Sequence, residues 1–204
     1  MGPGNGAYIF CTPVANGRLW AFYNICENMK RFFFLIAVTL SGCSQTFFYY
    51  DYQFKGEGRY IQGVPSFPQE ENYCGPAALA GVLNYWGHKV SQEEIAKEVF
   101  TTRIKGTITV DMINYAKRAG FRASPYKGSI ENIQSEINQV HPLIIYLDTG
   151  YKIAPKGHYI VVVGYNKEGV IAHSGRDREA FIPYEKLLKS WEKTGYWTLL
   201  ILPK

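Results

Sequence analysis

The order of apolar and polar positions divides residues 61–204 into a helical part followed by a part made of strands. Small and apolar side chains occupy almost every position of 74–86, which predicts a central, buried helix that Gly87 ends. Ser91 and Glu94 have the spacing of a capping box, so a second helix is expected to run from there to about 100. Two further amphipathic helices are predicted near 109–119 and 129–140.

The second part is rich in short apolar runs that are typical of buried strands. Strands are predicted at 143–147, 158–165, 170–173, 180–182 and 196–202, with a short helix at 184–192. Residues 166–169 read as the hairpin turn between the second and third of these strands. Helices first and antiparallel strands second indicate an α+β fold in which the helical half packs on one antiparallel sheet.

The N-terminal region has a different composition. Lys30 and Arg31 precede the apolar run 32–40, which is too short to span a membrane, and small residues then lead to Cys43. This segment resembles a bacterial lipoprotein signal. The resemblance implies cleavage before Cys43, a lipid on its thiol, and a chain anchored in the cell envelope. Ser44, rather than aspartate, is similar to lipoproteins sent to the periplasmic face of the outer membrane. The alternative is a buried strand with an incidental cysteine.

These features give a domain organisation. Residues 1–28 lack periodicity and precede the signal, so we expect Met29 to be the true start and 1–28 to be a mis-assigned extension. Residues 29–42 are then the signal peptide, 43–60 the lipidated N-terminus and a tether rich in Tyr, Phe and Gly, and 61–204 one folded domain. Cys11 and Cys26 would not reach the mature protein.

Charge and histidine spacing exclude several classes of function. The net charge is +5, and the basic residues are scattered rather than clustered, so no nucleic-acid partner is predicted. The four histidines are widely spaced and Cys74 has no second thiol nearby, so no metal site is expected. No phosphate-binding glycine loop occurs, and no cofactor is predicted.

Cys74 is the one cysteine of the predicted mature domain, and it opens the central helix. The N–H groups and the dipole at a helix N-terminus stabilise a thiolate, the reactive form of cysteine. Pro76 suits the first helical turn because its missing N–H has no partner to lose there. The alternative is a structural thiol at the start of a buried helix.

A cysteine nucleophile needs a base, and His158 is the best placed of the histidines. It begins the apolar strand 158–165, which would hold its imidazole rigidly at the edge of the sheet. His88 follows the helix-ending Gly87, and His141 precedes a proline in a loop, so neither is favoured. A histidine beside Cys74 could take the thiol proton and later return it to the leaving group.

Three segments together carry a resemblance to a peptidase family. The start Gln69-x4-Cys74-Gly75-Pro76, the helix end Tyr85-Trp86-Gly87 and the strand 158–165 resemble the bacteriocin-processing peptidases, which cut leader peptides after a double glycine. Here the domain would be a stand-alone, lipid-anchored form. The resemblance implies a papain-like fold with Cys74 as nucleophile, His158 as general base and Gln69 as an oxyanion donor.

The third catalytic residue departs from the family pattern. An aspartate or asparagine is expected after the strand that follows 158–165, but His173 or Ser174 stands there and Asp177 lies a few residues further on. His173 and Asp177 are therefore the candidates for orienting His158. Asp177 has an alternative, an ion pair with Arg176 or Arg178 at the surface.

These observations predict a thiol peptidase that acts on a peptide or protein in the cell envelope. An exporter encoded nearby is an expected partner, since related peptidases are often fused to transporters. Two other functions remain open. The domain could be a degenerate peptidase fold that binds peptides without cutting them, or a thiol acyltransferase that uses the same residues.

Overall fold

The computed structural model describes residues 58–68, 72–151 and 153–204, all of which belong to the second of two compact units, Tyr49–Lys204. The expectations for the extension, the signal peptide, Cys43 and the tether up to residue 57 lie outside the described residues, and so does the expectation for Gln69.

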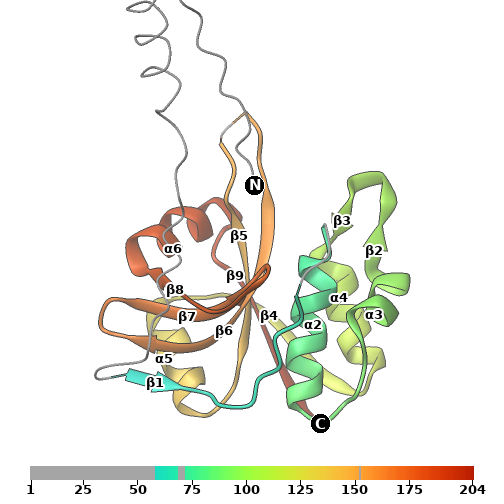
Figure 1. Ribbon diagram of the computed structural model, residues 1–204, viewed down its shortest axis with the longest axis horizontal. Coiled ribbons are helices and arrows are strands. Elements are labelled where there is room, and N and C mark those ends of the chain that lie inside the picture. The colour runs from blue at the N-terminus through green and yellow to red at the C-terminus, as the bar shows by residue number, and fades with distance from the viewer. Residues whose placement is uncertain (1–57, 69–71, 152) are drawn as a thin grey trace, which may run out of the picture. The chain divides into compact units, whose positions relative to one another are not determined.

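The first part of the domain is helical, as expected (Figure 1). Its helices are α2 (Cys74–Tyr85), α3 (Gln92–Val99) and α4 (Thr109–Arg118). Between α3 and α4 the chain forms a small hairpin of β2 (Phe100–Thr101), the 3₁₀ turn η1 (Thr102–Ile104) and β3 (Gly106–Thr107). Strand β4 (Phe121–Lys127) and helix α5 (Ile130–Asn138) follow.

The second part supplies most of the sheet. Its elements are β5 (Leu143–Asp148), β6 (Gly157–Asn166), β7 (Gly169–Ser174), β8 (Asp177–Pro183), α6 (Tyr184–Trp191), the 3₁₀ turn η2 (Glu192–Thr194) and β9 (Trp197–Pro203). The strands pair in the order β4-β9-β5-β6-β7-β8, all antiparallel. The short strand β1 (Gly58–Tyr60) pairs with the far end of β6.

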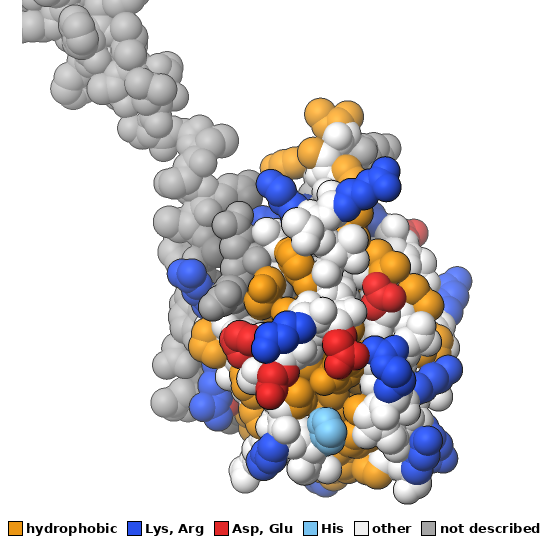
Figure 2. All heavy atoms as spheres, turned by 90° about the vertical axis from the view of Figure 1, so that its right-hand side faces the viewer, with side chains coloured by type: hydrophobic (Ala, Val, Ile, Leu, Met, Phe, Trp, Pro, Cys, Tyr) orange, Lys and Arg blue, Asp and Glu red, His pale blue; other side chains and the backbone are white. Residues whose placement is uncertain are grey.

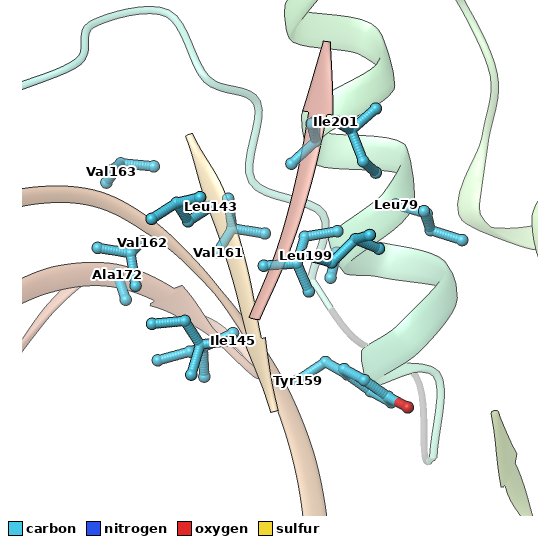
Figure 3. Close-up of a cluster of buried hydrophobic side chains, with 14 of the residues drawn as sticks. Leu79, Leu143, Ile145, Tyr159, Val161, Val162, Val163, Ala172, Leu199 and Ile201 are labelled. Carbon is cyan, nitrogen blue, oxygen red and sulfur yellow. The ribbon is translucent and has the colours of Figure 1, made fainter. Parts of the chain in front are cut away.

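Helices cover both faces of this sheet. Helix α2 packs mainly on β6, whereas α5 packs against β5 and β6, and α6 packs against β5, β7 and β8 (Figure 1). The core between them consists largely of buried apolar side chains, and Figure 3 shows some of those that α2, β5, β6, β7 and β9 contribute. Leu79 of α2, Leu143 of β5 and Leu199 of β9 are completely buried, and the burial of such apolar side chains stabilises the packing of α2 on the sheet.

Local signals set the ends of the helices where they were predicted. Ser91 accepts a hydrogen bond from the backbone N–H of Glu94, and the Glu94 carboxylate accepts one from the backbone N–H of Ser91. The Ser129 hydroxyl caps α5 by accepting a hydrogen bond from the backbone N–H of Asn132. Gly87 adopts a positive φ of 87° just beyond α2, a conformation that favours glycine.

The α+β fold with the central helix on an antiparallel sheet is confirmed, and three features differ from expectation. Residues 58–60 belong to the sheet as β1, so the predicted tether ends earlier. Strand β4 and the hairpin β2–β3 were not predicted. None of the helices in the described part of the chain is long and apolar enough to cross a bilayer.

Candidate active site

Helix α2 places Cys74 at its first position. Tyr73 is the N-cap residue, and Asn72 before it has a positive φ of 68°, which turns the chain into the helix. The first turn contains no acidic residue, so no side-chain carboxylate competes for the positive end of the helix dipole. A side chain at Gly75 would overlap Thr107 of β3, with only 2.7 Å between the two Cβ atoms, so glycine is required for β3 to lie beside the start of α2.

The thiol of Cys74 is half-buried and has no disulfide partner. Burial raises its pKa, because a thiolate loses solvation there. Hydrogen bonds from the backbone N–H groups of Tyr159, Gly75 and Cys74 itself act in the opposite direction. The contact with Tyr159 brings the sulfur to the residue that directly follows His158. The structure therefore brings Cys74 and the start of β6 together.

His158 lies near the start of β6, where Leu147 of β5 is its cross-strand neighbour. Its Nε2 atom lies 2.9 Å from Oγ of Ser174 on β7, and Nδ1 has no hydrogen-bond partner among the described residues. Burial, helped by the charge of Lys156, lowers the pKa of His158 to about 4. The imidazole is consequently neutral near pH 7 and has one nitrogen available to accept a proton.

The structure assigns the contact with His158 to Ser174 and to neither of the two residues predicted for this role. His173 donates from Nε2 to the carbonyl of Val64 (3.0 Å), and its Nδ1 accepts from the backbone N–H of Glu179 (3.2 Å). Both of its ring nitrogens are thus engaged away from His158. Asp177 is exposed and pairs by register with Ser174 across a β-hairpin. Among the described residues, Ser174, rather than His173 or Asp177, makes the hydrogen bond to His158.

The register of the strands explains this outcome. A bulge shifts the pairing of β6 with β7 between Val162 and Gly164, and a second irregularity lies between Ala172 and Ser174. Because each one-residue shift moves a side chain to the other face, counting along the sequence could not decide between residues 173 and 174.

An aromatic cluster lies beside the Cys-His pair. Tyr146 stacks on Tyr159 with ring centroids 4.5 Å apart, and Trp197 meets both rings edge-on. The Tyr159 hydroxyl donates to the Thr107 carbonyl (3.1 Å), which ties β6 to β3. Burial raises the pKa of Tyr146, and the charge of a Cys74 thiolate would raise it further. The sequence carried no signal for this cluster beyond its aromatic residues.

A groove of about 410 Å³ opens next to the pair. It is bordered by Tyr146 and Trp197, by Gly157 immediately before His158, and by Asp148 and Lys193. A side chain at Gly157 would overlap the Tyr146 hydroxyl, so glycine keeps this part of the groove narrow. An extended peptide could enter it with its backbone close to His158.

Gln92 was not predicted to be near the site. Its side chain is buried, and Nε2 donates to the carbonyl of Pro68 (3.0 Å), the residue before Gln69. Helix α3 therefore fixes the chain just upstream of the predicted oxyanion donor. Among the described residues no group of three or more His, Cys, Asp or Glu side chains could hold a metal ion.

The arrangement suits a proton transfer rather than a preformed ion pair. Burial favours a neutral Cys74 and a neutral His158, and the serine at His158 Nε2 carries no charge that would stabilise an imidazolium. Attack by sulfur on a bound carbonyl would then require the thiol proton to move to Nδ1 during the reaction.

Comparison with solved structures shows the same fold in several peptidases. A C39-like peptidase from Bacillus anthracis aligns with a TM-score of 0.59 at 17% identity, covering 73% of this chain and 99% of that one. The peptidase domain of Streptococcus ComA, a bifunctional ABC transporter in a quorum-sensing pathway, aligns with a TM-score of 0.59 at 23% identity, covering 70% and 100%. A double-glycine-motif protease from an AMS/PCAT transporter, in complex with its leader peptide, aligns with a TM-score of 0.54 at 23% identity, covering 73% and 100%.

A search of curated protein sequences finds no match. A family model, in contrast, matches residues 61–198, which is more than half of the chain and contains Cys74, His158 and Ser174. The chain belongs to the Peptidase C39-like family.

Proposed function

We propose that this protein is a cysteine peptidase that cuts a peptide substrate, with Cys74 as nucleophile and His158 as general base. The observation that supports this most is the juxtaposition at the start of β6. The sulfur of Cys74 contacts the N–H of Tyr159, while the preceding His158 is held through Nε2 by Ser174 and keeps Nδ1 available. Family membership and a neighbour with a bound leader peptide agree with a peptide substrate.

The reaction would proceed in two steps. The proton of Cys74 Sγ moves to His158 Nδ1 as sulfur bonds to the substrate carbonyl carbon. The backbone N–H of Cys74 and the amide of Gln69 would stabilise the resulting oxyanion. His158 then gives the proton to the leaving amine, which breaks the peptide bond and leaves a thioester. Water, deprotonated by His158, hydrolyses the thioester and restores the free thiol.

A peptide carrying a thiol-reactive warhead tests this function. The wild-type chain should be labelled rapidly at Cys74, and His158→Ala should lower the rate by at least about a hundredfold because no base remains. Cys74→Ser should fold normally and lose peptide cleavage, since a hydroxyl is far less ionised than a thiol. Cleavage that persists in Cys74→Ser would remove Cys74 from the mechanism.

One observation favours a second function, peptide binding without cleavage. The pKa of Cys74 is raised and that of His158 is lowered, so both shifts oppose the thiolate–imidazolium pair of a highly reactive cysteine. A binding module should take up peptides in the groove with equal affinity in the wild type and Cys74→Ser. It should also react with the warhead no faster than an ordinary buried thiol.

We place this activity in the cell envelope. The support comes from the sequence of residues 29–43, which resembles a lipoprotein signal that ends at Cys43. The substrate would then be a peptide at the periplasmic side of a membrane, and an exporter encoded nearby would supply it. Transfer of the acyl group to an amine instead of water would use the same residues.

A further inference from the structure

Exposed apolar side chains are concentrated on two hairpins. Among the described residues, seven large hydrophobic side chains are exposed, and five of them lie on the β5–β6 tip or on the stretch that joins η1 to α4. They are Tyr151 (81% exposed), Ile153 (96%), Ile104 (53%), Val110 (49%) and Ile108 (44%). We call residues 149–157 the long tip and residues 101–110 the short tip. Both project toward the same end of the domain in Figure 1.

The charge of the two tips has a single sign. The long tip contains Lys152 and Lys156, the short tip contains Arg103 and Lys105, and neither segment contains Asp or Glu. The nearest carboxylates along the sequence are those of Asp111, in the first turn of α4, and Asp148, whose Oδ1 accepts the N–H groups of Gly150 and Lys156. In Figure 2 apolar side chains cap this end, Lys and Arg side chains flank them, and the Asp and Glu side chains lie lower on the molecule.

The long tip is also held in place at its base. Lys193 of η2 donates to the carbonyls of Asp148 (3.3 Å) and Gly150 (2.7 Å), and the N–H of Thr149 donates to the carbonyl of Lys156 (2.9 Å). A hairpin tied in this way presents Tyr151 and Ile153 outward at little additional entropic cost on binding. Both side chains are almost fully exposed, as expected for a projection and not for the wall of a pocket.

From these observations we infer that the two tips insert into the surface of an anionic lipid bilayer. Aliphatic and tyrosine side chains enter the boundary between headgroups and acyl chains, and the surrounding Lys and Arg side chains attract anionic headgroups. The Cys-His pair lies between the hairpins, since Gly75, the residue after Cys74, adjoins Thr107 of the short-tip strand β3 and His158 follows the long tip. Docking would thus present the groove to peptides at the membrane surface. The inference concerns binding and does not depend on the proposed catalytic function.

The test places a fluorescent side chain on the tip and measures its contact with lipid. The full chain carrying Tyr151→Trp is mixed with vesicles of phosphatidylglycerol and phosphatidylcholine that contain brominated acyl chains. The control is Val140→Trp, because Val140 is also exposed (41%) but precedes β5 at the end opposite the long tip. All other tryptophans are common to both variants, so their difference reports on position 151.

Bromine should quench Tyr151→Trp more strongly than Val140→Trp in anionic vesicles, and the difference should vanish in vesicles of phosphatidylcholine alone. Adding Lys105→Glu or Lys156→Glu should weaken the tip-specific quenching by about fivefold or more for each residue. Ile153→Asp should abolish it.

Equal quenching of the two variants, or none at position 151, would overturn the inference. So would an Ile153→Asp variant that raises KM for a soluble peptide without any lipid-dependent signal, since that result would make the tips a peptide-docking surface. A tip signal that depends on protein concentration in the absence of vesicles would instead identify a second copy of the chain as the partner.

Discussion

At the scale of single residues, the most unusual feature is that a serine contacts His158, the proposed base. An aspartate or asparagine oxygen at His158 Nε2 would only accept a hydrogen bond, so it would fix the proton on Nε2 and leave Nδ1 free to act. The Ser174 hydroxyl can either donate or accept. The hydroxyl positions the ring without fixing the tautomer. Because it carries no charge, it does not offset the lowering of the His158 pKa by burial.

Variants of Ser174 therefore separate positioning from charge. In the wild type the acid limb of kcat/KM should lie near pH 4, because His158 must be neutral to accept the thiol proton and its pKa is about 4. Ser174→Asp should move this limb to higher pH, because a carboxylate stabilises the imidazolium and raises the pKa. Ser174→Ala should lower kcat roughly tenfold or more.

Ser174→Asn serves as the matched control, since it restores a fixed acceptor without charge. It should recover much of the kcat lost in Ser174→Ala. The acid limb of its kcat/KM profile should stay near the wild-type pH. A pH profile that is identical in all four proteins would show that Ser174 does not act through His158.

His173 has a structural role that makes stability depend on pH. Burial lowers its pKa, so the folded protein binds a proton there less readily than the unfolded chain does. The stability that neutral His173 contributes to the fold is present above the pKa of this residue in the unfolded chain, about 6.5. It is lost as the pH falls through the pKa of His173 in the folded protein. Protonation would also remove the acceptor for the N–H of Glu179.

His173→Gln tests this role by thermal unfolding between pH 7.5 and pH 5. The variant keeps a donor for the Val64 carbonyl but cannot titrate. The wild-type Tm should therefore fall more steeply with acidification than the Tm of the variant. Parallel curves would assign the acid sensitivity to other groups, of which His158 is the first to examine.

At the scale of elements, the sequence predicted those segments whose signals are local. The four main helices and the strands β5 to β9 follow from periodicity, capping residues and apolar runs. Strand β4 was missed because Pro125 stands in its middle, and proline is compatible only with a position at the edge of a sheet. Strands β1, β2 and β3 are too short to give a period.

The candidate site likewise contains residues that local sequence signals could identify and contacts that they could not. Cys74 and His158 could be named because each begins an element with a clear signal, and the structure brings those two elements together. The contact with Ser174 depends on two shifts of register, and the aromatic cluster depends on how β5, β6 and β9 align. Both are non-local, so no pattern within one segment could have predicted them.

The contact of α2 with β3 gives a prediction at this scale. Gly75→Ala should destabilise the fold by roughly 1–3 kcal/mol, because its Cβ would overlap Thr107 and push β3 away from the nucleophile. Gly106→Ala, one residue from Thr107, has its nearest neighbour 3.8 Å away and should be tolerated. Denaturant unfolding of both variants gives the comparison.

Removing Thr107 atoms should relieve the overlap. The double variant Gly75→Ala with Thr107→Gly should lose less free energy of unfolding than the sum of the losses in the two single variants. Strict additivity would mean that Gly75 is needed for some reason other than contact with β3.

At the scale of the whole molecule, the lipoprotein hypothesis determines which substrates the domain can meet. Cys43→Ser should block lipid attachment and signal cleavage, leaving a larger precursor, because the cysteine thiol is the group that would be acylated. Incorporation of an alkyne fatty acid, followed by gel mobility, measures both effects. A wild-type chain that takes up no label, or a Cys43→Ser chain that still does, would contradict the hypothesis and move the domain out of the envelope.

The position of β1 sets how far such an anchor would reach. β1 pairs with Gly164–Asn166, at the opposite end of the ten-residue strand β6 from the long tip, about 33 Å away along the sheet. The fifteen residues from Cys43 to 57 can span at most about 50 Å. The linker from a lipid on Cys43 to β1 would therefore be longer than strand β6. The lipid and the two tips could then bind the same membrane at the same time. Insertion of the lipid and insertion of the tips would then strengthen each other, because each raises the effective concentration of the other at the membrane. A linker shortened by about ten residues would lose this avidity, although the lipid itself would stay inserted.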